Sequence, residues 1–484
     1  MKKLNSMLRI ALTILFVSLG FSVRGEQSGE KINIILFVSD DHGTDALGCY
    51  GNSVIQTPNL DQLAKEGALF TNAYCTASTC SASRSAILTG KFSHATGHYG
   101  HAHSYHHFST YDTIIALPTY LEELGYHTAR IGKYHLAPES VYSFNEVLNA
   151  NPRNTVQMAE KCRNVIENDQ PFFLYFCTDD PHRGAPFDLD SWDLPNSFGN
   201  KEEGYEGVQK TVYDPEDVIV PDFLPDTPEC QKELAQYYQS VSRIDQGFGR
   251  LMDILKESGK AENTVIIYIS DNGIAFPGAK TTTYDPGIKL PCIIKAPGQK
   301  GKGVVKDEMI SWVDLTPTIM DYAGIHPEKM YFHGRSFKPV IEGKDTKGWD
   351  EIYCSHIFHE VTMYYPMRVI RTRNYKLIWN IAWRLEYPFA TDLWAASTWQ
   401  GVYRRGDEFY GKREVEHYLF RPEFELYDIQ NDPDEINNLA EKPEYSSVLD
   451  SLINQVKQFQ IDTKDPWIIT WEHKNTFGGS GLNL

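Results

Sequence analysis

The sequence predicts an α/β fold, with a large, mostly parallel sheet flanked by helices and a smaller antiparallel sheet after it. Short apolar runs alternate with helical patterns from residue 32 to about residue 322, which is the order of elements expected of a parallel sheet. Most of the apolar runs lack alternating polar residues, as do strands buried on both faces. Beyond about residue 343, two adjacent strand-like runs and a final helix indicate the smaller layer.

The elements of the large sheet can be assigned in chain order. In the first apolar run only Asn33 is polar, and acidic residues follow it directly. The predicted strands are Ile32–Val38, His127–Gly132, Pro171–Cys177, Thr264–Ser270 and Pro291–Ala296. Helical periodicity, proline near helix starts and glycine after helix ends mark most of the segments between them. The predicted helices are Asn59–Glu66, Ser81–Leu88, Pro118–Leu124, Glu233–Glu257 and Leu315–Tyr322.

The character of the chain changes at Gly343–Asp350. The runs Met367–Arg371 and Lys376–Trp379 flank a short turn and predict paired strands. A final helix is predicted over Tyr445–Gln460. We therefore expect a main domain over residues 26–345 and a smaller domain over residues 346–484.

The N-terminus has the features of a secretory signal peptide. Lys2, Lys3 and Arg9 precede or begin an apolar run from Ile10 to Val23. We expect residues 1–25 to be removed on export, to the periplasm or the medium if the source is bacterial; an uncleaved anchor is the alternative. No other apolar run approaches the roughly 20 residues that span a bilayer, so we expect no membrane span in the mature chain.

The net charge indicates which binding partners are excluded, and the spacing of the cysteines indicates whether they form disulfides. The chain has a formal charge of −18, and residues 1–25 hold four basic and no acidic side chains, so their removal leaves about −22. An acidic surface argues against nucleic acid and against capture of a long polyanion, although the end of a polyanion can enter a locally basic pocket. The eight cysteines are widely scattered, which is typical of buried thiols rather than of a disulfide framework.

Two polar pairs stand directly after predicted strands. Asp40-Asp41 follows the first strand, and Asp271-Asn272 follows the strand Thr264–Ser270. Either pair alone could be a turn or a helix cap. Because ligands of open α/β sheets bind beyond the carboxyl ends of the strands, the two pairs together indicate one site. Their oxygen atoms suit Ca²⁺ or Mg²⁺ rather than Zn²⁺.

The segment Cys80-Ser81-Ala82-Ser83-Arg84, with Leu88-Thr89-Gly90 after it, resembles the signature of the type I sulfatases. The resemblance implies an alkaline-phosphatase-like fold. It also implies a maturation enzyme that oxidises Cys80 to formylglycine, whose hydrated aldehyde attacks sulfur. Ala82 stands where the motif more often has proline. This difference affects which maturation enzyme modifies Cys80 more than whether one does. A buried thiol at Cys80 is the alternative.

The same resemblance implies roles for the residues around Cys80. The metal ligands of the family, with Ca²⁺ expected and Mg²⁺ as the alternative, match Asp40, Asp41, Cys80, Asp271 and Asn272. Its catalytic groups match Arg84, Lys133, His135, His182 and Lys280. By resemblance, Arg84 holds the aldehyde hydrate and the metal ligands, while Lys133 and Lys280 bind sulfate. His135 is the expected base for sulfate release, and His182 the expected proton donor to the leaving group. Lys280 replaces an arginine of similar proteins, which keeps the charge but loses the bidentate fork.

Further segments resemble the sulfamidase branch of this family, the N-sulfoglucosamine sulfohydrolases. They include His106-His107-Phe108, Asp180–Arg183, His359–Met363 and Asp465–Trp467. The branch implies removal of N-linked sulfate from glucosamine at the non-reducing end of heparan sulfate or heparin fragments. Candidate sugar contacts from the smaller domain are His359, Glu360 and Arg368; alternatively, these residues tie the two domains together.

Three other functions stay open. Core chemistry does not choose between N–S and O–S cleavage, so an O-sulfatase acting on a related glycosaminoglycan or another sulfated glycan is the first alternative. A phosphoester hydrolase of the same superfamily is disfavoured, because those enzymes usually have serine or threonine where this chain has Cys80. An inactive protein that binds sulfated glycans is disfavoured by the full set of catalytic matches.

One histidine-rich stretch could be mistaken for a zinc site. It contains His94, His98, His101, His103, His106 and His107. The stretch lacks cysteine partners, is rich in Gly, Ser and Tyr, and has no convincing helical pattern. We therefore expect a loop that lines the pocket rather than a zinc centre.

Overall fold

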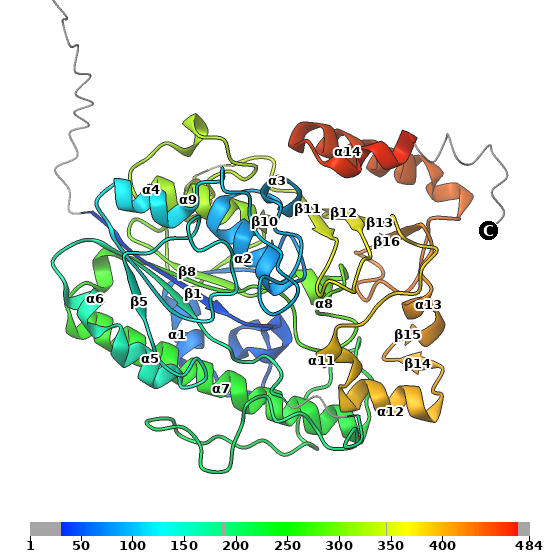
Figure 1. Cartoon of the computed structure of the whole chain (residues 1–484), viewed down its shortest axis with the longest axis horizontal. Helices are drawn as coiled ribbons and strands as arrows, with labels where there is room; N and C mark the ends of the chain where they lie inside the picture. The colour runs from blue at the N-terminus through cyan, green and yellow to red at the C-terminus, as the bar shows by residue number, and fades with distance from the viewer. Residues whose placement is uncertain (1–30, 186–188, 345, 473–484) are drawn as a thin grey trace, which may run out of the picture. The chain divides into compact units, whose positions relative to one another are not determined.

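A mixed sheet lies at the centre of the larger part of the molecule (Figure 1). The structure is a computed structural model that describes residues 31–185, 189–344 and 346–472. Within those ranges the sheet has eight strands. Their order is β5 (Glu146–Leu148), β4 (His127–Gly132), β6 (Phe172–Cys177), β1 (Asn33–Ser39), β7 (Thr264–Ser270), β8 (Cys292–Lys295), β2 (Ala68–Phe70) and β9 (Val304–Lys306). The strands from β5 to β7 are parallel, whereas β8 is antiparallel to both neighbours, so the expectation of a mostly parallel sheet is confirmed.

Strand β1 lies in the middle of the parallel strands. Ile34 is opposite Phe173 of β6, and Asn33 is opposite Thr264 of β7. All seven residues of β1 are buried, because successive side chains point to opposite faces of the sheet and helices cover both faces. The uninterrupted apolar pattern of the sequence therefore has a direct structural cause.

Two layers of helices cover the sheet. One layer packs on the face of Ile35 and Phe37 and consists of α1 (Pro58–Glu66), α5 (Thr155–Lys161), α6 (Arg163–Glu167) and α7 (Pro228–Glu257). The other packs on the face of Ile34 and Leu36 and includes α2 (Cys80–Thr89), α4 (Leu117–Glu123) and α9 (Leu315–Tyr322). The long helix α7 begins before the predicted Glu233, because Thr227 accepts a hydrogen bond from the backbone N–H of Cys230 and caps the helix.

A second sheet has four antiparallel strands among the described residues. Their order is β11 (Glu351–His356), β12 (Met367–Thr372), β13 (Tyr375–Asn380) and β16 (Phe424–Asp428). Helix α14 (Ser446–Thr463) packs on this sheet through Leu452 and Val456, which cluster with Ile370 and Leu377. The predicted pair of strands and the final helix are confirmed. The described residues from 32 onward form one compact unit, and the division between residues 345 and 346 stays a prediction.

Two further expectations concern the ends and the cysteines. The predicted signal peptide, residues 1–25, lies outside the described residues. In the three described ranges, every helix is too short or too polar to cross a membrane. All eight cysteines lie in these ranges and are unpaired, and all except Cys49 are buried.

Candidate active site

The carboxyl ends of four neighbouring parallel strands meet at one place. Strands β4, β6, β1 and β7 are adjacent in the sheet, and polar residues follow each of them. These residues are Lys133 and His135 after β4, His182 after β6, Asp40 and Asp41 after β1, and Asp271 and Asn272 after β7. The backbone N–H of Asp40 donates to the carbonyl of Asp180, and that of Asp271 donates to the carbonyl of Ser39, at 3.0 and 3.1 Å. The topology thus gathers residues that are far apart in the sequence, such as Asp41 and Asp271, which are 230 positions apart.

A cluster of buried ligand atoms lies at the centre of this site. One oxygen each of Asp40, Asp41 and Asp271 and the sulfur of Cys80 all lie within 4.8 Å of one another. The amide oxygen of Asn272 is buried and has no hydrogen-bond partner among the described residues. Hard oxygen atoms, one of them unpartnered, are the donors that Ca²⁺ and Mg²⁺ take in proteins. The residues present therefore fit a divalent cation of this class.

Cys80 is the first residue of α2 and is fully buried. Its sulfur lies 3.8 Å from Oδ1 of Asp41. Burial raises the pKa of the Cys80 thiol well above its usual range, and the protonated thiol is a poor nucleophile. The unmodified side chain is therefore not prepared for thiolate chemistry, although it lies at a helix N-terminus that favours anions.

Arg84, one turn further along α2, links two of the acids. Its Nε donates to Oδ2 of Asp271 at 2.8 Å, and its Nη2 lies 3.4 Å from Oδ1 of Asp40. The guanidinium also donates to the backbone carbonyl of Lys133. All three charged side chains are fully buried, and removing one partner of such an arrangement costs about 3–5 kcal/mol. Arg84 therefore fixes the positions of the acids.

Two lysines form ion pairs with the acids of the cluster. Nζ of Lys133 lies 2.5 Å from Oδ2 of Asp40, and Nζ of Lys280 lies 2.9 Å from Oδ2 of Asp41. Burial favours the neutral form of Asp40, but Lys133 and the other nearby cations outweigh it and hold the pKa of Asp40 well below its usual range. Burial dominates at Asp271 and raises its pKa to about 7, although Arg84 opposes the shift.

His182 is held by one ring nitrogen and presents the other to the site. Nδ1 lies 2.8 Å from the carbonyl oxygen of Arg183 and must donate to it. Nε2 therefore accepts from Nζ of Lys280 at 3.0 Å and lies 3.7 Å from Oδ2 of Asp41. Burial, followed by the charge of Lys280, lowers the pKa of His182. The imidazole is thus a neutral proton carrier beside the acids.

A cavity of about 390 Å³ opens onto this cluster. The large sheet supplies Asp40, Lys133, His135 and His182 to its wall, and the chain after β11 supplies His359 and Glu360. His101, His103 and His106 complete one side. The stretch was expected to be a loop that lines the pocket, and this holds for these three histidines. It is wrong for His94, which lies in the helix Ser93–Thr96 and outside the pocket wall. His135 contacts His103, and its expected role as the base for sulfate release stays a prediction.

The three candidate sugar contacts have different surroundings. Nδ1 of His359 lies 2.8 Å from Oγ1 of Thr79, so His359 both lines the pocket and ties the smaller sheet to the residue before Cys80. Glu360 accepts hydrogen bonds from the backbone and hydroxyl of Thr391 at 2.8 and 2.9 Å. The structure does not support the expected sugar contact for Arg368. Its guanidinium is buried and is occupied by Asp465, at 2.5 and 2.8 Å, outside the pocket wall.

Sequence reasoning missed three charged residues of the pocket wall, Arg153, Asp179 and Asp392. Asp392 lies in the four-residue helix α11 (Thr391–Trp394), and its Oδ2 lies 3.0 Å from Nζ of Lys280 and 3.9 Å from Nε2 of His182. The segment has no motif, and the helix is too short to have a periodic pattern. The only available signal is that a buried Lys280 requires acidic partners.

Comparisons with known proteins show which families and chains this protein is similar to. The family model "Sulfatase" matches residues 32–325, and the model "N-sulphoglucosamine sulphohydrolase, C-terminal" matches residues 279–389. The chain is 35% identical to the human N-sulphoglucosamine sulphohydrolase over 460 residues, which cover 90% of this chain and 91% of the human one. It is 29% identical to an ulvan-active sulfatase of Formosa agariphila, over 88% of this chain and 79% of that one. A solved structure of a protein with its substrate D-glucosamine-2-N,6-O-disulfate has the same fold, with a TM-score of 0.65 and 24% identity over 90% of this chain and 99% of that one.

Proposed function

The chain belongs to the sulfatase family, and we propose that it removes N-linked sulfate from glucosamine at the non-reducing end of heparan sulfate or heparin fragments. The observation that carries the proposal is the similarity to the human N-sulphoglucosamine sulphohydrolase along nearly the whole chain. The match to the C-terminal model of those enzymes covers part of the pocket wall, including His359 and Glu360. Substrate choice is expected to depend on that wall, because the cluster of acids and cations is suited to sulfate esters as well as to sulfamates.

We propose further that Cys80 is converted to formylglycine by a maturation enzyme. We also propose that Ca²⁺ binds the oxygen atoms of Asp40, Asp41, Asp271 and Asn272, which we call the oxygen site. When both groups are present, they supply a nucleophilic hydroxyl and a positive charge for the sulfate oxygens. The fully buried cysteine with a raised pKa and the unpartnered oxygen of Asn272 support this proposal. The signal-like pattern of residues 1–25 supports export of the enzyme.

The lysines of the chain bind the anion in this mechanism. Lys133 and Lys280 carry their charges into the cluster from two different loops. Ammonium groups that are already fixed in place stabilise the negative charge of a sulfuryl group, because they need not reorganise during the reaction. Because both are paired with acids in the free protein, they are positioned before the substrate arrives.

His182 serves as the proton carrier for the leaving amine. Its Nδ1–H is fixed on the carbonyl of Arg183, so only Nε2 can exchange a proton with the substrate. Lys280 donates to that nitrogen, and Asp392 in turn fixes Lys280. His135, which also lines the pocket, is the proposed base that promotes release of inorganic sulfate.

A comparison of two monosaccharides tests the proposal. The mature enzyme is incubated with N-sulfoglucosamine and with N-acetylglucosamine 6-O-sulfate, and inorganic sulfate is measured. We expect sulfate release from the first sugar and at most a trace from the second, with none from either sugar for Cys80→Ala. Preferential release from the 6-O-sulfated sugar would replace the proposal with the O-sulfatase alternative.

A further inference from the structure

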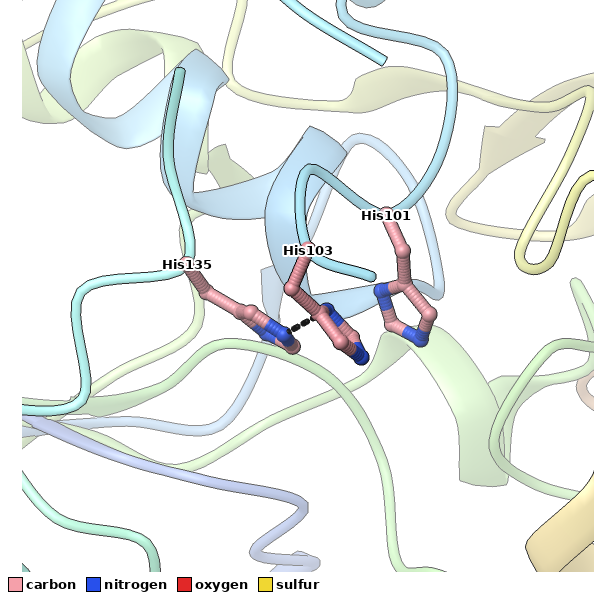
Figure 2. Close-up of side chains that lie close together, drawn as sticks. All are labelled: His101, His103 and His135. Atoms are coloured by element: carbon pink, nitrogen blue, oxygen red, sulfur yellow. Dashed lines mark hydrogen bonds between the residues drawn. The ribbon is translucent and has the colours of Figure 1, made fainter. Parts of the chain in front are cut away.

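Three imidazoles from two separate segments converge in the wall of the pocket. Figure 2 shows His101, His103 and His135 with their rings side by side, and a ring nitrogen of His101 on the side of His103. One nitrogen of each ring lies within 4.8 Å of the others. The rings of His103 and His135 are stacked, with their centroids 4.2 Å apart. His101 and His103 belong to the loop after α3 (Ser93–Thr96), whereas His135 follows β4.

Nε2 of His101 lies 2.9 Å from Nε2 of His359, but the other nitrogens of this trio are poorly supplied with protein partners. Nε2 of His135 contacts Nδ1 of His103, which is another imidazole rather than an acid or a carbonyl. Nδ1 of His101 and Nδ1 of His135 are buried and have no hydrogen-bond partner in the described part of the chain. His101 is only 6% exposed, so its free nitrogen is largely withdrawn from water. A buried polar atom without a partner is costly, and a shared ligand would remove that cost.

The three rings are available as neutral donors. Burial lowers the pKa of His101 and of His135 well below the usual range, and it lowers the pKa of His103 to about 4. Nearby cations, including Lys133, act in the same direction. Near neutral pH each ring therefore keeps a lone pair that can bind a metal ion.

We propose that His101, His103 and His135 form a second cation site, which takes a transition-metal ion such as Zn²⁺. Three neutral imidazoles are a ligand set that selects Zn²⁺, Cu²⁺ or Ni²⁺ over Ca²⁺ and Mg²⁺. Three histidines also leave the fourth tetrahedral position of zinc open to water or a ligand. His103 is exposed on a loop, so its ring can turn to bring the nitrogens to the distance of about 2.0–2.1 Å that zinc requires.

This site differs from the oxygen site in chemistry and in consequence. An ion there binds His135 and occupies the wall of the pocket that the substrate must enter. Zinc should therefore inhibit sulfate release. This inhibition rests on the proposed function, whereas the binding of zinc to the three histidines does not depend on it. The sequence pattern did not indicate a zinc centre, because the third ligand comes from a segment 32 residues away.

Cobalt binding tests the site without an activity assay. The full-length mature protein, in saturating Ca²⁺, is titrated with Co²⁺, and Zn²⁺ is then added as a competitor. We expect one equivalent of Co²⁺ to give visible absorption bands of a nitrogen-ligated ion, which Zn²⁺ abolishes. His103→Ala should weaken binding by at least about 100-fold, since even outer-shell partners of a metal are worth 10–100-fold.

His107→Asn is the matched control. His107 lies in the same loop outside the trio, and its left-handed backbone, with φ of 54°, suits asparagine. This variant should bind Co²⁺ as the wild type does. The proposal is overturned if the wild type binds no Co²⁺ in Ca²⁺, if His103→Ala binds it unchanged, or if both variants lose it equally.

Discussion

Residue 80 lies where an ordinary cysteine would contribute little. Its thiol is fully buried, its pKa is raised, and three carboxylates lie close to it. A thiolate there would add negative charge to an acidic cluster, whereas an uncharged hydroxyl would not. The signature around Cys80 was local and could be recognised from the sequence, but this electrostatic reason for its chemistry appeared only with the structure.

Replacing the nucleophile should abolish turnover and leave the fold intact. Cys80→Ala removes one buried sulfur but keeps the helix start, so the far-UV circular dichroism should not change. We expect kcat for sulfate release to fall by at least about 1,000-fold, because the remaining groups can bind and polarise but cannot form the covalent intermediate. Appreciable turnover by the purified variant would contradict the mechanism.

The rate should depend on pH through His182. Donation to the leaving amine requires the protonated ring, and burial with Lys280 lowers the pKa of His182 from its usual value. The protonated fraction is therefore lost as pH rises through a value below about 6.5. We expect kcat to decrease from mildly acidic to neutral pH, as measured by initial rates. A kcat that increases with pH over that interval would show that another group donates the proton.

Asp392 is expected to act as a positioning residue through Lys280. Asp392→Asn removes a carboxylate 3.0 Å from Nζ of Lys280 and 3.9 Å from Nε2 of His182. Loss of this negative charge should lower the pKa of His182 further, so the decline of kcat should move to lower pH and kcat should fall about 10-fold. Asp407→Asn, at an exposed ion pair with Arg405, is the control and should leave the profile unchanged. An unshifted profile for Asp392→Asn would assign this residue a structural role only.

Among the elements, the sequence predicted the long buried strands and missed the short ones. Strands such as β1 and β7 have seven residues with a continuous apolar pattern, which identified them and placed Asp40 and Asp271 at their ends. Strands β2 and β9 have three residues each, and a pattern of that length cannot be separated from a loop. Helix α11 was missed for the same reason, and Asp392 with it.

The link between β12 and the end of α14 should make a measurable contribution to stability. Arg368→Ala leaves Asp465 buried without its cationic partner, although Gln460 and the backbone N–H of Trp467 still donate to it. Loss of one partner of a buried ion pair costs about 3–5 kcal/mol in the free energy of unfolding. The Arg373→Ala control removes partly exposed ion pairs of the adjacent turn and should cost less than about 1 kcal/mol. Urea denaturation measures both. If Arg368→Ala instead raises KM and keeps its stability, Arg368 is a sugar contact after all.

At the scale of the whole molecule, one pocket is built from both sheets. The large sheet supplies Asp40, Lys133, His135 and His182 to its wall, and the chain after β11 supplies His359, Glu360 and Asp392. Sequence patterns predict elements and strand ends but not which loops pack together over long separations, as the contact between Thr79 and His359 shows. The pairing of Arg368 with Asp465, 97 positions away, could not be predicted for the same reason, and its role as a sugar contact stays a prediction.

Loading of the oxygen site should stabilise the whole fold. An ion that binds only the folded state adds about 2.7 kcal/mol at a concentration 100 times its dissociation constant. We therefore expect Ca²⁺ to raise the thermal unfolding midpoint of the chelator-treated enzyme. The increase should be smaller in Asn272→Ala, which loses the unpartnered oxygen. An identical Ca²⁺-dependent increase in both proteins would place the ion elsewhere.

Mass analysis of the tryptic peptide Glu66–Arg84 tests the central claim most directly. This peptide contains both Cys75 and Cys80, so the first cysteine is an internal control for alkylation. After native expression, reduction and alkylation, the account predicts one alkylated thiol at Cys75 and an aldehyde at position 80. A peptide with two alkylated cysteines would contradict it, because the proposed nucleophile would then be missing from the active enzyme.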